Sequence, residues 1–240
     1  DPLFLHIGFC ALSALSRSGQ SRPFHRDADG LLPAEGAALV ALKRLADARR
    51  DGDRVLGVIR GVGLSNDGRG RGLLAPAEEG QIRAMRAAYA MSGLTPAQVS
   101  LIECHATGTP VGDGTELRSM AALYEGRRDV PIGSLKGNLG HLITAAGVAG
   151  LIKVIGAFQA KTRPPTLHAD APIDALAGSP FRLLAEAEPW SAEGPRVAAV
   201  SAFGFGGNNA HLLVSEDDRG ASVQSFVPKA PRPALAVVGL

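Results

Sequence analysis

"SLKGNLGHLITAAGVAGLIKVIGAFQA", residues 134–160, joins a glycine-rich turn to a long apolar helix. The run 142–158 is apolar nearly all round and rich in alanine and glycine. A helix of this kind is normally buried between layers, because its small residues let neighbouring elements approach closely. The stretch therefore predicts a layered α/β fold in which one helix lies between two sheets.

The rest of the chain predicts strands that alternate with helices and end in an antiparallel pair. The expected strands are 37–42, 55–64, 99–104, 130–135, 197–205 and 209–216. The expected helices are 43–52, 76–93, 113–124 and 141–160. Asp113 is expected to cap its helix, with Glu116 at the spacing of a capping box.

Bulk composition excludes several functional classes. The 240 residues are 45% hydrophobic and 20% charged, which is typical of a soluble globular domain. A net charge of +2 and 5% aromatic residues do not support nucleic-acid binding. The longest apolar stretch is interrupted by Thr144, Gly147, Gly150 and Lys153, so no membrane span is expected. Two cysteines and no signal-peptide pattern predict a reducing, cytoplasmic location.

The ends of the sequence predict a larger parent protein. The first residue is Asp1 rather than methionine, and residues 1–215 are expected to belong to one domain. Residues 216–232 lack an apolar period and are expected to form a linker. The final "PALAVVGL", residues 233–240, is interpreted as a possible first strand of a following domain.

Cys104 and His105 are neighbours at the carboxyl end of the predicted strand 99–104. Adjacent side chains in a strand point to opposite faces, so the two cannot easily share a proton. Cys104 is therefore interpreted as a small buried hydrophobe. His105 lies at the carboxyl end of the strand, where ligands gather in open α/β sheets, and Thr107 and Thr109 follow it. A strand-to-helix turn with a structurally satisfied histidine is the alternative interpretation.

Two further turns contain candidate site residues. Lys136 and His141 lie before a helix, whose N-terminus favours developing negative charge and disfavours a protonated imidazole. A neutral His141 can thus donate a hydrogen bond to an oxyanion. Phe205 lies in "SAFGFGGNN", where glycines let backbone N–H groups face a ligand and the ring can gate a pocket. A surface lysine, a helix-start histidine and an ordinary hairpin turn are the structural alternatives.

Three motifs in order, "ECHATGTPVGD" (103–113), "SLKGNLGHLITAAGVAGLIK" (134–153) and "SAFGFGGNNAH" (201–211), resemble the β-ketoacyl synthase family. These are the condensing enzymes of fatty-acid, polyketide and polyunsaturated-fatty-acid synthases. "FHRDADGLLPAEGAALVALKRL" and "SNDGRGRGLLAPAEEGQ" resemble the preceding stretches, so the similarity covers about residues 7–215. It implies a thiolase-like α/β fold, a five-layer α-β-α-β-α sandwich that is usually dimeric. This chain matches its C-terminal half, with a buried central helix and a closing antiparallel strand pair.

The resemblance also implies a mechanism. His105 and His141 would donate hydrogen bonds to the malonyl thioester oxygen during decarboxylative condensation, and Lys136 would order the histidine region. Thr107 and Thr109 match positions that contact a phosphopantetheine arm, and Phe205 matches a gating phenylalanine. That arm would come from an acyl carrier protein. The other implied partners are the N-terminal half of the domain and a second copy of the full protein. No metal and no covalently bound cofactor are expected.

In the family, the nucleophilic cysteine belongs to the preceding half. The resemblance therefore assigns no role to Cys10 and predicts that this chain alone is inactive. Two alternatives stay open: a chain-length-factor-like partner without catalysis, and a loading domain that only decarboxylates, with glutamine in place of the cysteine. The sequence departs from the usual family pattern at Ala34 and at Asn208, and the second departure lies beside the gate.

Overall fold

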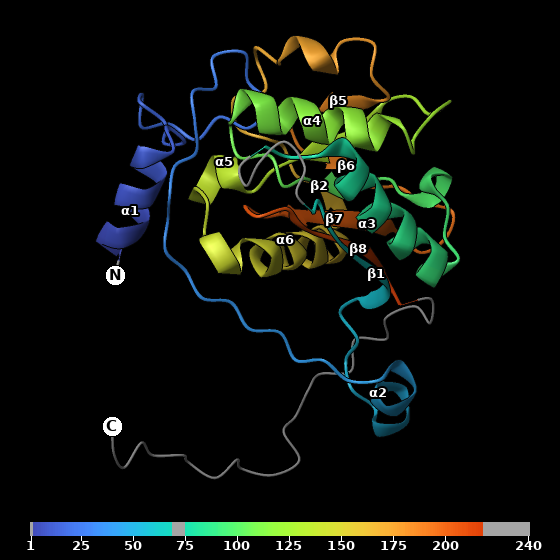
Figure 1. Ribbon diagram of the computed structural model, residues 1–240. Helices are drawn as coiled ribbons and strands as arrows, with labels where there is room; N and C mark the ends of the chain where they lie inside the picture. Colours follow the sequence, from blue (N-terminus) through green and yellow to red (C-terminus); the bar gives the residue numbers. More distant parts are fainter. Residues whose placement is uncertain (1, 69–74, 218–240) are drawn as a thin grey trace, which may run out of the picture.

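A computed structural model describes residues 2–68 and 75–217 of the chain (Figure 1). The main strands are β1 (Val58–Asn66), β2 (Ile102–Glu103), β3 (Val130–Gly133), β5 (Phe181–Leu183), β7 (Val197–Phe203) and β8 (Asn208–Ser215). They form one six-stranded mixed sheet in the order β1-β8-β7-β2-β3-β5. The pairs β7–β2, β2–β3 and β3–β5 are parallel, whereas β8 is antiparallel to both β7 and β1. Strands β4 (Thr162–Arg163) and β6 (Glu188–Pro189) form a separate pair.

Helices cover both faces of this sheet (Figure 1). The α-helices are α1 (Pro2–Ala11), α2 (Leu45–Asp51), α3 (Glu78–Ser92), α4 (Pro110–Ala121), α5 (Lys136–Leu139) and α6 (Ala146–Ala160). Short 3₁₀ turns occupy Pro96–Gln98, Ile143–Ala145 and Asp174–Leu176. Helices α3 and α4 lie on one face and α6 lies on the other, so the described chain contains a helix–sheet–helix arrangement.

The side-chain alternation of β7 and β8 divides the core into two parts. Ala199 and Leu213 belong to the cluster that packs under α3 and α4. Their neighbours Val200 and Val214 belong to the cluster that packs on α6. Successive strand residues point to opposite faces. A strand that is buried on both faces therefore has a nearly continuous apolar sequence. This explains why the sequence 197–203 is apolar almost throughout.

Helix α3 approaches β1 closely enough to require glycine. A Cβ atom added at Gly63 would lie 1.8 Å from the backbone oxygen of Ala84, and one at Gly61 would lie 2.3 Å from that of Ala88. No side chain fits at such distances without moving the backbone. The two glycines therefore set how near α3 can lie to the edge of the sheet.

Four sequence expectations are wrong in detail. Residues 37–42 form no strand, and Leu39 is 94% exposed there, because no described strand lies beside them to pair. Strand 99–104 is reduced to β2, and the expected helix 141–160 begins with a 3₁₀ turn before α6. Helix α4 begins at Pro110, so Asp113 lies within it and does not cap it. Pro110 suits the first turn of a helix because its missing N–H would have no partner there.

The expected linker at 216–232 is described only through Asp217. The strand expected at 233–240 lies outside the described residues. Within the described part, Glu216 still belongs to the domain, because its carboxylate accepts hydrogen bonds from Arg196 at 2.9 Å.

The segment Ile143–Ala160 is long and apolar enough to cross a membrane by length and composition alone, with a mean hydropathy of 1.6. In the fold, its α6 part packs against β7 and β2, and Lys153 within it pairs with Glu103 at 2.7 Å. Among the described residues 28% of the segment is buried, and Ile152 is 45% exposed. We therefore interpret the segment as a helix that packs one face on the sheet.

Replacing Gly63 by alanine should lower the free energy of unfolding by about 1–3 kcal/mol, because the added methyl group would overpack the α3–β1 contact. Gly156→Ala is the matched control, since nothing lies within 4 Å of a Cβ at that helical position. The control should raise the free energy of unfolding by about 0.5–1 kcal/mol. Urea denaturation of both variants measures these changes. Equal stability of Gly63→Ala and the unmodified chain would contradict the packing argument.

Candidate active site

A cavity of about 700 Å³ lies beyond the carboxyl ends of β2 and β7. His105 and Thr107 reach it from the loop after β2, and His141 reaches it from the loop before α6. Phe205 reaches it from the turn between β7 and β8. Much of the remaining wall is apolar and comes from α6, β7 and β8. The structure thus brings together both histidines, Thr107 and Phe205 from separate parts of the sequence.

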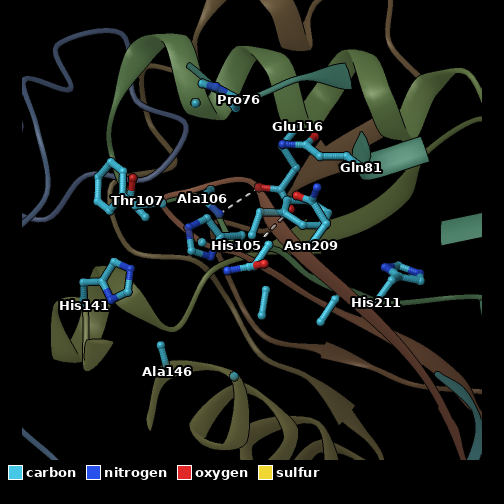
Figure 2. A pocket seen from close by; sticks show the side chains of 18 of the residues that line it. Pro76, Gln81, His105, Ala106, Thr107, Glu116, His141, Ala146, Asn209 and His211 are labelled. Atoms are coloured by element: carbon cyan, nitrogen blue, oxygen red, sulfur yellow. Dashed lines mark hydrogen bonds between the residues drawn. The ribbon is translucent and has the colours of Figure 1, made fainter. Parts of the chain in front are cut away.

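The loop after β2 is held by two carboxylates of α4. Glu116 accepts hydrogen bonds from the backbone N–H groups of His105 and Ala106, both at 2.8 Å. Asp113 accepts hydrogen bonds from those of Thr107 at 3.0 Å and Gly108 at 3.2 Å. Figure 2 shows Glu116 above the cavity, with His105 and Ala106 beneath it. The two acids thus hold four consecutive backbone donors in place.

His141 is fixed by its backbone and by its ring. Its N–H donates to the carbonyl of Leu32 at 2.7 Å, and its carbonyl accepts from Ala34 N–H at 2.9 Å. Its Nδ1 accepts the backbone N–H of Ile143 at 2.9 Å. In a neutral imidazole only one nitrogen carries a proton, so Nδ1 as acceptor places the proton on Nε2. His141 therefore presents an Nε2–H donor.

The backbone that fixes this tautomer is itself strained. Ile143 has a φ of 52°, which is uncommon for a residue other than glycine. For a β-branched side chain such a conformation costs about 1–3 kcal/mol and persists only where the surroundings enforce it. The hydrogen bond from Ile143 N–H to Nδ1 of His141 is one of the contacts that hold Ile143 in this conformation.

The two imidazoles form a pair, with ring centroids 5.5 Å apart at an angle of 77°. Burial lowers the pKa of His141 to about 4, and the charge of Lys136 contributes to this shift. Burial also holds the pKa of His105 well below its usual range, with smaller contributions from Lys136 and His141. Both rings are therefore neutral at pH 7, so each can act as a hydrogen-bond donor without carrying a charge.

Lys136 is buried and 6% exposed, which excludes a surface lysine. It is not among the residues that line the cavity, but its charge contributes to the pKa shifts of both histidines. Burial lowers its pKa, and the nearby acidic groups of Glu103 and Glu116 act in the opposite direction. Within the described part of the chain, no side chain forms an ion pair with its ammonium group. Its charge acts on the histidines through space.

The remaining predicted residues lie at different depths. The hydroxyls of Thr107 and Thr109 are 3.0 Å apart, and Thr107 lines the cavity whereas Thr109 does not. Phe205 is 46% exposed, and its ring centroid lies 5.4 Å from that of Phe9 in α1. The Phe9–Phe205 contact closes one side of the cavity, and the sequence analysis did not anticipate it.

A polar contact that the sequence analysis missed supports the turn bearing Phe205. Asn209 donates a hydrogen bond to Asp67 at 2.6 Å, and Asp67 N–H donates to the carbonyl of Gly207 at 2.9 Å. Asp67 also accepts from the backbone N–H of Ala77 at 3.1 Å. Asp67 lies in "SNDG", residues 65–68, a stretch quoted above only for its family resemblance. Sequence spacing alone does not show that 67 and 209 are neighbours.

The interpretation of Cys104 as packing is confirmed. Cys104 is 1% exposed and belongs to the core cluster under α4, with its Sγ 4.0 Å from the sulfur of Met120. Burial raises its thiol pKa well above the usual value, which suppresses the reactive thiolate. Cys10 is exposed on α1 and does not line the cavity.

Comparison with known proteins places these residues in a family context. Residues 56–170 match the model for the β-ketoacyl synthase C-terminal domain, and residues 4–48 match that for the N-terminal domain. The polyketide synthase GfsA of Streptomyces halstedii is 41% identical over 233 residues, which cover 94% of this chain and 3% of that protein. A spectinabilin polyketide synthase system protein of Streptomyces orinoci is 45% identical over 221 residues, which cover 89% of this chain and 6% of that protein. The chain thus spans only a small part of the length of these relatives.

Solved structures agree with the sequence relatives. The ketosynthase from module 6 of the bacillaene synthase of Bacillus subtilis 168 matches with a TM-score of 0.86 and 37% identity, covering 88% of this chain and 40% of that one. The PfaC keto synthase–chain length factor matches with a TM-score of 0.85 and 41% identity, covering 90% of this chain and 24% of that one. The chain therefore spans less than half of either structure.

The cavity also contains a buried histidine whose protonation should affect stability. His211 is 1% exposed, and burial lowers its pKa from 6.5 to about 4. Between these values the unfolded chain binds more protons than the folded one, so the free energy of unfolding falls as the pH falls. Replacing His211 by glutamine should flatten this dependence between pH 7 and pH 5. Urea denaturation at several pH values measures the slope.

His168→Gln is the control for that experiment, because His168 is exposed and does not line the cavity. Its slope should equal that of the unmodified chain. If His211→Gln and the unmodified chain lose stability equally over this range, His211 is not held neutral by burial.

Proposed function

Because this chain belongs to the β-ketoacyl synthase family and has its thiolase-like fold, we propose that it supplies one wall of a condensing site in polyketide biosynthesis. The reaction joins an enzyme-bound acyl thioester to malonyl-acyl carrier protein. The malonyl carboxylate leaves as carbon dioxide, and its bonding electrons form a thioester enolate. The enolate carbon attacks the acyl carbonyl, the enzyme thiolate leaves, and β-ketoacyl-acyl carrier protein results.

The pair of neutral imidazoles, His105 and His141, is the observation that carries this proposal. Both rings face the cavity, and Nε2 of His141 carries its proton. A thioester oxygen placed between them would gain negative charge as carbon dioxide leaves. Donors aimed at such a developing charge each contribute about 3 kcal/mol to lowering the barrier.

Lys136 supports the histidines electrostatically. Its positive charge disfavours a proton on either imidazole, and so helps to keep both rings in the neutral donor form. It also contributes a favourable potential for an enolate in the cavity. We assign it an ordering role behind the histidines, which agrees with its position outside the cavity wall.

The cavity mouth fits a flexible arm with a thioester at its end. Thr107 presents a hydroxyl at the cavity wall, and this hydroxyl is hydrogen-bonded to that of Thr109, with 3.0 Å between the two oxygens. The exposure of Phe205 and its contact with Phe9 support a gating role for its ring. We propose that these residues receive the phosphopantetheine arm of an acyl carrier protein. A homodimeric assembly in the cytoplasm completes the proposal.

The nucleophile is proposed to come from outside this chain. Both cysteines of the sequence lie among the described residues, and neither lines the cavity. A buried thiol with a raised pKa, such as Cys104, is a poor nucleophile. A non-catalytic chain-length factor is the second candidate, since the name of one structural neighbour includes a chain length factor beside a keto synthase. The presence of His105, His141 and Lys136 favours the condensing role.

In the full-length protein, His141→Ala should reduce malonyl decarboxylation by about 100-fold, which corresponds to the loss of one oxyanion donor. Acyl loading on the nucleophile should be spared, because that step does not use this donor. Mass spectrometry of the loaded protein and of the malonyl carrier measures the two steps separately. His168→Asn is the control, since asparagine tolerates the positive φ of 59° at that exposed position. Unaltered decarboxylation in His141→Ala would refute the assigned role.

The 240-residue chain by itself should form no β-ketoacyl product from an acyl donor and malonyl-acyl carrier protein. Mass spectrometry of the carrier protein after incubation is the measurement. Formation of the ketoacyl product would show that a residue of this chain accepts the acyl group, and Cys10→Ser would then test whether that residue is the exposed cysteine.

A further inference from the structure

Glu103 connects the strand that leads to His105 with the turn that carries Lys136. It lies at the end of β2 and is 4% exposed. One carboxylate oxygen accepts the backbone N–H of Leu135 at 2.6 Å. The other accepts the ammonium of Lys153, from α6, at 2.7 Å. One side chain therefore joins three elements that meet behind the cavity.

Leu135 begins the short segment, residues 135–141, that leads through α5 to His141. Leu135 is the N-cap of α5, and its carbonyl accepts the N–H groups of Asn138 at 2.9 Å and Leu139 at 3.1 Å. His141 follows α5 after a single glycine. Because Glu103 holds Leu135 by its N–H, a shift of this carboxylate would be passed along α5 to His141.

Helix α6 is built to approach this carboxylate. A Cβ atom at Gly150 would lie 3.0 Å from Cγ of Glu103, so the small residue leaves space for the acid. Lys153 lies one turn further along the helix, and its side chain is 13% exposed. Glycine at one position and lysine at the other hold Glu103 between the helix and the sheet.

Stability alone is a weak reason for such a pair. Replacing a buried ion pair by apolar residues of similar volume is often neutral or stabilising, because desolvation offsets the Coulomb attraction. The pair does provide geometric definition, since Glu103 has one backbone donor and one cationic donor at short distances. It also places a negative charge near the buried ammonium of Lys136.

We infer that Glu103 is a positioning residue that sets the placement of His141 and Lys136 relative to His105, and that Lys153 fixes Glu103 in this role. The inference rests on the proposed condensing function and adds two residues that do not touch substrate. Loss of Glu103 or Lys153 should displace the catalytic groups. The rate of the chemical step should therefore fall, and binding of the malonyl carrier should change little.

The test compares four single variants of the full-length protein: Glu103→Leu, Glu103→Gln, Lys153→Met and the control Glu188→Leu. Glu188 accepts two hydrogen bonds from Arg182, both at 2.7 Å, in β5 and β6, and neither residue lines the cavity. Malonyl decarboxylation is measured as kcat and KM, together with thermal unfolding. Glu103→Leu should lower kcat by about tenfold to 100-fold, as expected for a misplacement of about 1 Å, with KM changed less than about threefold.

The conservative variant separates positioning from folding. The amide oxygen of Glu103→Gln can still accept the Leu135 N–H, so kcat should recover to between the values of Glu103→Leu and the unmodified protein. Lys153→Met should lower kcat without raising KM. Glu188→Leu should leave kcat unchanged, whatever its effect on thermal unfolding. If Glu103→Leu fails to fold, Glu103→Gln and Lys153→Met decide the question by the same kcat criterion.

Two results would overturn the inference. One is a kcat within twofold of the unmodified protein in the Glu103 and Lys153 variants, and the other is an equal loss of kcat in Glu103→Leu and Glu188→Leu. If the unmodified protein does not decarboxylate malonyl groups, the proposed function fails instead. Crystal structures of the unmodified protein and Lys153→Met would then judge the geometry. An unchanged separation of the His105 and His141 rings, 5.5 Å here, would overturn the positioning role.

Discussion

Two buried carboxyl groups of α4 determine where the loop after β2 can lie. Asp113 and Glu116 accept the backbone N–H groups of residues 105–108, and Asp113 accepts a fifth from Phe24 at 2.8 Å. Burial raises the pKa of Glu116 to about 8 and that of Asp113 to about 6, so these acids carry a substantial desolvation cost. The backbone donors offset part of that cost. The bond to Phe24 extends the constraint to the segment 24–34, whose end holds His141 through Leu32 and Ala34.

The sequence predicts the elements whose pattern is local. Helix α3 ends at Gly93 as expected, because glycine adopts the left-handed conformation there with a φ of 67°. The closing hairpin, the central helix α6 and the burial of Cys104 also follow from short-range patterns. The residues 37–42 are apolar enough to predict a strand, but a strand also needs a neighbour for its hydrogen bonds. That requirement is not visible in six residues of sequence.

The same distinction applies to the candidate site. Family resemblance identifies six residues, and four of them line one cavity in the structure: His105, Thr107, His141 and Phe205, but not Thr109 or Lys136. Three of the contacts that support them are long-range: Asp67 with Asn209, Glu103 with Lys153, and Phe9 with Phe205. Each pair joins residues that are at least 50 positions apart. Local spacing rules describe neighbours in one helix or strand, so they contain no information on such pairs.

The hydrogen bond from Ile143 N–H to Nδ1 of His141 fixes the histidine donor through the main chain, whereas the side chain at 143 contributes to the shape of the cavity wall. A main-chain group fixes the imidazole tautomer, so the donor does not depend on which side chain stands at position 143. That side chain lines the cavity. A change in the size of the residue at 143 therefore alters the cavity wall while the proton stays on Nε2, as long as that residue keeps its backbone N–H. In this wall, the dimensions of the cavity and the direction of its donor can change independently of each other.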